Sequence, residues 1–77
     1  MEFDRIREII SNILGIPAEQ IHPDSQLGDD LCADSLQVSE IILAIEEEFQ
    51  FEWKNINLNE MYTVEELYRK MCALKHQ

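Results

Sequence analysis

Three segments of this 77-residue chain repeat apolar residues at intervals of three and four. This spacing keeps apolar side chains on one face of an α-helix, whereas a half-buried strand alternates every second residue. Only two Gly and two Pro interrupt the chain, which disfavours a turn-rich β fold. A chain of this length suits one small domain with a limited core and little room for an enclosed active site. The sequence therefore predicts a single all-α domain.

The first predicted helix covers residues 4–14. Gly15 supplies a C-terminal stop, and Pro17 prevents the helix from continuing. A long first loop over residues 16–33 should follow, and residues 17–20 within it can form one short helical turn. Three apolar residues can pin this loop to the core: Ile21, Leu27 and Leu31.

The second predicted helix begins after Asp34, an N-cap whose capping box is completed by Gln37, and runs to Phe49. A short turn of helix is expected over residues 57–61. The last helix starts at Thr63 with a second capping-box pattern. The expected order is therefore three main helices and one short helix, with a long first loop.

The second helix should present two different faces. At about 100° per residue, its core face contains Val38, Ile41, Ile42, Ile45 and Phe49. Its opposite face carries Leu36, Glu40, Leu43 and Glu47. Two stacked leucines among carboxylates favour a docking surface with an apolar centre and an acidic rim. The alternative is that Leu36 or Leu43 packs under the long loop.

Charge narrows the class of partner. Sixteen Asp and Glu against six Lys and Arg give a net charge of −10, and residues 8–52 contain eleven acidic residues and no Lys or Arg. Such a field repels nucleic acid and anionic membranes and steers basic protein partners, although a merely soluble acidic surface is the alternative. No apolar run approaches the roughly 20 residues of a membrane span, and the acidic start lacks signal-peptide features. We therefore expect a cytoplasmic protein, in which Cys32 and Cys72 are free thiols rather than a disulfide or zinc ligands.

Ser35 is predicted to lie in the first turn of the second helix, with its hydroxyl exposed. Unpaired backbone N–H groups and the positive end of the helix dipole meet there, and both favour a phosphate. A plain capping serine is the alternative, since Ser is common at helix starts.

Residues 29–36, Asp-Asp-Leu-Cys-Ala-Asp-Ser-Leu, resemble the prosthetic-group motif of acyl carrier proteins. The resemblance continues through Glu-Glu-Glu-Phe at residues 46–49 and Thr-Val-Glu-Glu-Leu at residues 63–67, and it covers nearly the whole chain. It implies a small four-helix bundle whose carrier domain spans residues 1–77. It also implies that a phosphopantetheinyl transferase moves 4′-phosphopantetheine from coenzyme A to Ser35.

The same resemblance implies a carrier and not an enzyme. The arm would hold acyl groups as thioesters and move them between enzymes of fatty-acid, polyketide or related biosynthesis. Its partners would be acyl-loading, condensing or modifying enzymes with basic docking patches, and the carrier itself would be a monomer. The positions that match partner contacts in this family are Asp34, Leu36, Glu40, Leu43, Glu46, Glu47 and Met61.

Three positions depart from the usual family pattern. Cys32 stands where Gly is usual, and its side chain restricts a backbone that Gly leaves free. Gln37 replaces a common acidic residue, and the stretch 51–55 carries Trp53 where an aliphatic residue is typical. We expect Trp53 to pack against the end of the second helix, near the acyl-binding interior. These differences indicate a specialised carrier.

Rival functions have weaker support in the sequence. Ser35 with His22 or His76 could suggest nucleophilic catalysis, but no nucleophile elbow is present. A calcium-binding EF-hand read from Asp29 would place Leu31 and other apolar residues where oxygen ligands are needed. A peptidyl or aminoacyl carrier, or an unmodified acidic adaptor that only docks partners, remains the alternative.

Overall fold

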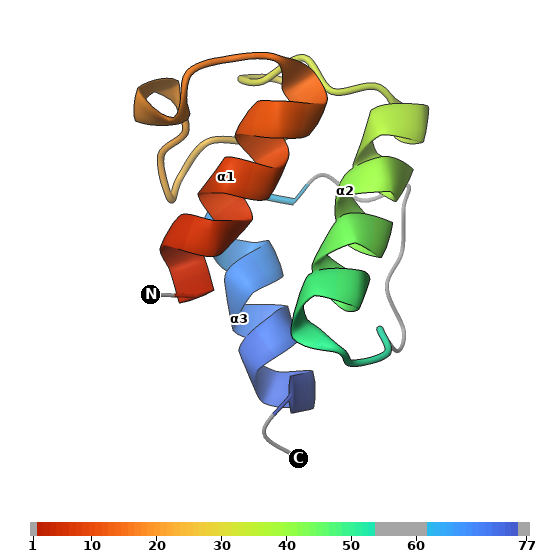
Figure 1. The fold of residues 1–77 in the computed structure, drawn as a ribbon. Helices are drawn as coiled ribbons and strands as arrows, with labels where there is room; N and C mark the ends of the chain where they lie inside the picture. The colour runs from red at the N-terminus through yellow and green to blue at the C-terminus, as the bar shows by residue number, and fades with distance from the viewer. Residues whose placement is uncertain (1, 54–61, 76–77) are drawn as a thin grey trace.

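The computed structural model describes residues 2–53 and 62–75. The helices of this part of the chain are α1 (Glu2–Leu14), α2 (Ser35–Phe49) and α3 (Val64–Lys75), with one 3-10 turn, η1 (Ala18–Gln20) (Figure 1). The three main helices and the turn within the long loop are therefore confirmed. The short helix expected over residues 57–61 lies outside the described residues. Across the described ranges, none of the helices has the length and apolar character needed to span a membrane.

Helix α1 begins at Glu2, two residues before the predicted start. It ends at Leu14, and the following Gly15 takes a φ of 69° and donates its N–H to the carbonyl of Ser11 (2.8 Å). Gly adopts this conformation without a Cβ clash. The added N-terminal residues bring Phe3 edge-on against Tyr68 of α3, with ring centroids 5.6 Å apart. This aromatic pair ties the start of α1 to α3.

Helices α2 and α3 each start with the predicted capping box. At α2, the Asp34 carboxylate accepts the Gln37 N–H (2.8 Å), and the Gln37 side chain accepts the Asp34 N–H (3.2 Å). At α3, Thr63 and Glu66 exchange the same two bonds, at 3.1 and 2.9 Å. Each box satisfies backbone donors that the first helical turn leaves unpaired.

The long loop between α1 and α2 is held against the start of α3. The Leu27 N–H donates to the Tyr62 carbonyl (3.0 Å), and the Val64 N–H donates to the Ser25 carbonyl (3.1 Å). Tyr62 is buried, which the sequence analysis did not anticipate. The loop is pinned to the core as predicted, because Ile21 and Leu27 are fully buried and Leu31 packs against the core.

The core lies between the three helices, and α1 contacts both α2 and α3 (Figure 1). Each helix contributes one apolar face, and the fully buried side chains include Ile6, Ile10, Ile41, Ile45, Leu67 and Met71. The predicted core face of α2 is buried except for Phe49, which is half-buried at the end of the helix. The opposite face of α2 is therefore turned to solvent.

Candidate functional site

Ser35 is the first residue of α2, and its side chain is exposed. Asp34 caps the helix, so Ser35 is not the capping residue. The Ser35 hydroxyl has no hydrogen-bond partner among the described residues. The hydroxyl is thus available for chemistry carried out by another protein.

The first turn of α2 fits an attached phosphate. Within the described part of the chain, the backbone N–H groups of Ser35 and Leu36 have no partner, whereas the Gln37 N–H is bonded to Asp34. Unpaired N–H groups and the positive end of the helix dipole stabilise a nearby phosphodiester. The one carboxylate directly before the serine, that of Asp34, is engaged in the capping box.

The chain reaches this turn through Cys32, whose φ of 59° is left-handed. The next residue, Ala33, donates its N–H to the Leu27 carbonyl (2.8 Å), so the chain folds back on the loop before α2 begins. A residue other than glycine is strained in this region, so the backbone at this position would suit Gly better than Cys. The Cys32 thiol is free and exposed.

The face of α2 predicted to point outward is exposed to solvent. Leu36 is 68% exposed and Leu43 is 56% exposed, so the alternative in which either packs under the loop is wrong. Glu40 and Glu47 are exposed on the same face. We call these four residues, Leu36, Glu40, Leu43 and Glu47, the α2 stripe.

Glu46 lies on a different side of α2 from the stripe. It is half-buried, and its carboxylate accepts the backbone N–H of Trp53 (3.1 Å). The Trp53 ring is half-buried, donates its Nε1–H to the Ile42 carbonyl (2.8 Å) and meets Phe51 edge-on, with centroids 4.8 Å apart. Trp53 thus packs on α2 as predicted, although its ring bonds at Ile42 in the middle of the helix and not at its end. Glu46 holds the segment that follows the helix. The expected position of Trp53 near the acyl-binding interior stays a prediction.

An ion pair between α1 and α2 was missed by the sequence analysis. The Arg5 guanidinium donates to Glu48 of α2 (2.9 Å) and to Glu8 of α1 (2.7 Å). The bond from Arg5 holds the pKa of Glu48 below its usual range, and the two carboxylates raise the pKa of Arg5. The Glu8 contact follows helical spacing, but nothing in the local sequence indicates the contact with Glu48, 43 residues away.

Met61 and the residues that the rival functions would use have less bearing on the site. His22 is exposed, and its backbone N–H donates to the hydroxyl of Ser25 (3.0 Å). Met61 and His76 lie outside the described residues. Asp30 in the acidic loop accepts the Gln26 N–H (2.8 Å), which closes a turn.

The site therefore combines an accessible serine hydroxyl at a phosphate-compatible helix start with an apolar and acidic surface along the same helix. Residues 4–70 match the family described as phosphopantetheine attachment site. The chain is 38% identical to an acyl carrier protein of Solidesulfovibrio magneticus over 63 residues, which cover 82% of this chain and 81% of that protein.

Two further relatives agree. An acyl carrier protein of Clostridium acetobutylicum is 48% identical over 52 residues, covering 68% of each chain. One from Buchnera aphidicola is 44% identical over 61 residues, covering 79% of this chain and 77% of that protein. The chain belongs to the acyl carrier protein family. It is therefore an acyl carrier with a covalently attached 4′-phosphopantetheine group, and it interacts with a phosphopantetheinyl transferase and with biosynthetic enzymes.

Proposed function

We propose that Ser35 is the attachment site and that residues 1–77 act as one carrier domain for acyl intermediates. The observation that carries this proposal is the exposed and unbonded hydroxyl of Ser35 at the start of α2, within the region that matches the phosphopantetheine attachment family. When bound, the group supplies a thiol that holds an acyl chain as a thioester. The protein itself contributes the helix start that stabilises the phosphate and needs no catalytic residue of its own.

We also propose that the α2 stripe, with Asp34 beside the serine, docks the acyl-loading, condensing or modifying enzymes through their basic patches. The exposed leucines supply apolar contact, and the carboxylates orient a basic partner. Glu46 has a mixed role here, because its carboxylate also holds Trp53. Met61, outside the described residues, stays a candidate contact from the family resemblance. The proposal includes a monomeric, cytoplasmic carrier of fatty-acid, polyketide or related biosynthesis.

Modification with coenzyme A and a broad-specificity phosphopantetheinyl transferase tests the assignment. Peptide mapping should place one phosphopantetheine on Ser35, and Ser35→Ala should take up none. Ser39→Ala is the matched control, because Ser39 lies about one turn further along the same helix and should not alter modification. Labelling of Ser35→Ala at the wild-type level would remove the assignment.

The modification experiment and a following loading experiment separate the proposed acyl carrier from the alternative functions. An unmodified acidic adaptor would gain no mass in any variant. If Ser35 is modified, loading with aminoacyl and acyl pantetheine analogues distinguishes a peptidyl or aminoacyl carrier from the proposed acyl carrier, because only the cognate cargo should be passed on by partner enzymes.

A further inference from the structure

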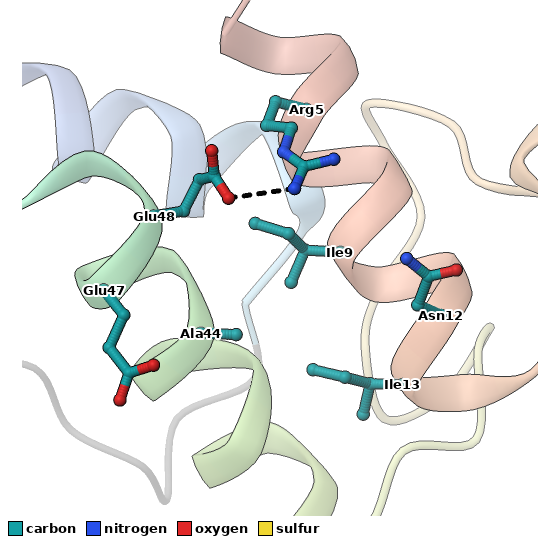
Figure 2. Close-up of a pocket in the computed structure, with 7 residues that line it drawn as sticks. All are labelled: Arg5, Ile9, Asn12, Ile13, Ala44, Glu47 and Glu48. Atoms are coloured by element: carbon teal, nitrogen blue, oxygen red, sulfur yellow. Dashed lines mark hydrogen bonds and ion pairs between the residues drawn. The ribbon is translucent and has the colours of Figure 1, made fainter.

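A groove of about 380 Å³ runs between α1 and α2. Its floor is apolar, formed by Ile9 and Ile13 of α1 and Ala44 of α2, which point toward one another (Figure 2). Its rim is polar and includes Glu47 and Glu48 of α2. An apolar floor inside a charged rim is the usual composition of a protein-docking surface.

The groove is continuous with the α2 stripe. Glu47 belongs to the stripe and also lines the groove. Leu43, an exposed member of the stripe, lies four residues before Glu47, and Ala44 of the groove floor lies three residues before it. Residues three and four apart are adjacent on a helix surface, so these positions form one surface that turns from α2 toward α1. A partner seated on the stripe would therefore reach the groove floor and Ile13 on α1 across the carboxylate of Glu47.

The rim has an excess of carboxylates and one basic residue. Arg5 is the basic side chain that lines the groove. The guanidinium of Arg7, on the same helix, donates to the Ala18 carbonyl (2.8 Å) and does not line the groove. The guanidinium of Arg5 donates to Glu48 across the groove (Figure 2) and also to Glu8 of α1. The carboxylate of Glu47 points away from Arg5 and has no ion-pair partner among the described residues. The rim thus offers one unpaired carboxylate and one that an arginine already occupies.

We propose that this groove docks a partner-enzyme segment presenting an apolar side chain flanked by basic side chains, and that Arg5 competes with the partner for Glu48. The apolar side chain packs on Ile13 and Ala44, while one cation binds Glu47. The Arg5–Glu48 pair itself demonstrates that a guanidinium is accommodated at that carboxylate, and both side chains are partly exposed, at 45% and 38%. The proposal rests on the carrier function inferred above and extends its partner surface from α2 onto α1.

Competition by Arg5 predicts opposite effects for the two halves of the ion pair. The probe is a purified condensing enzyme, chosen because it accepts acyl groups from the loaded wild-type chain. Arg5→Gln should lower the KM for the loaded carrier by about two- to fivefold, and Glu48→Gln should raise it by a similar factor. The kcat should not change, because the groove residues do not touch the arm's attachment point.

The Arg69–Glu65 pair of α3 (2.7 Å) provides matched controls. Arg69→Gln and Glu65→Gln change the net charge by the same amounts and break a comparable exposed ion pair, away from the groove. If these variants shift the KM as much as the groove variants do, overall charge explains the effect and the proposal is overturned. It is also overturned if Arg5→Gln raises the KM.

An NMR footprint tests the α1 contact directly. Adding the condensing enzyme to labelled loaded carrier should broaden the amides of Asn12, Ile13 and Ala44 together with those of the α2 stripe. Broadening confined to the stripe, with an unchanged KM for Ile13→Asn, would refute docking in the groove. Failure of the carrier function is visible separately, because the transferase would then leave Ser35 unmodified in every variant.

Discussion

Replacing Cys32 with glycine should stabilise the folded chain, because Cys32 is held at a φ of 59°. In this left-handed region, the Cβ of an L-residue crowds the following carbonyl oxygen, at a cost of about 1–2 kcal/mol. The Cys32 side chain is exposed, so its removal sacrifices little packing. Glycine also makes the unfolded chain more flexible, which offsets about 0.5–1 kcal/mol of the gain. The net stabilisation should be about 0.5–1 kcal/mol.

Urea unfolding followed by circular dichroism measures this difference. The midpoint should rise with an unchanged m-value, and the thermal midpoint should increase by about 2–8 °C for a domain of this size. Cys32→Ala removes the thiol but keeps the Cβ, so its stability should remain close to that of the wild type. Gln50→Gly offers an independent check, because Gln50 caps α2 at a φ of 55°. If Cys32→Gly is no more stable than Cys32→Ala, the strain argument fails.

Three further predictions concern α2 and its contacts. Trp53→Ala should destabilise the fold by about 2–4 kcal/mol, since it removes a half-buried ring and its hydrogen bond. Water-like tryptophan fluorescence of the wild type, together with a stable alanine variant, would contradict the packing of Trp53 on α2. Asp34→Ala should lower the free energy of unfolding by about 1 kcal/mol through the lost cap, and it should slow the modification of Ser35. Asp34→Asn should keep most of the stability and most of the modification rate. Equal losses in the two variants would argue against capping as the cause. Arg5 holds the pKa of Glu48 below its ordinary 4.5. The stabilising ion pair is therefore present above that pH and is lost as the pH falls through the lowered pKa. Carbon NMR should show the pKa of Glu48 rising in Arg5→Gln, and an unchanged pKa would refute the assigned cause.

The outward face of α2 shows which exposed side chains helical periodicity can predict. The spacing of Leu36 and Leu43 against the buried isoleucines predicted that both leucines face solvent, and both are exposed. This works because the direction of a side chain on a helix depends on its position in the local repeat. The prediction was weaker at the end of the helix, where Phe49 is half-buried instead of buried, since neighbouring segments decide burial at helix termini.

The proposed attachment site is also largely a local feature. Asp34 and Gln37 are three residues apart, so their capping box and the exposed position of Ser35 could be read from the sequence. The accumulation of acidic residues on α2 and its loop is likewise a property of composition and order. Assigning the serine to phosphopantetheine, however, depended on the family motif, because a serine at a helix start is common.

The sequence by itself determined the helices, their caps and the face of α2 that meets solvent, because each depends on residues within one or two helical turns. Only the tertiary structure decided that Arg5 bonds to Glu48, that Tyr62 is buried, and that Cys32 adopts a left-handed conformation. These features depend on how segments far apart in the chain pack and how the connecting loop must turn to join them. Local propensity carries no information about such distances, so the groove between α1 and α2 becomes visible only once the helices are assembled.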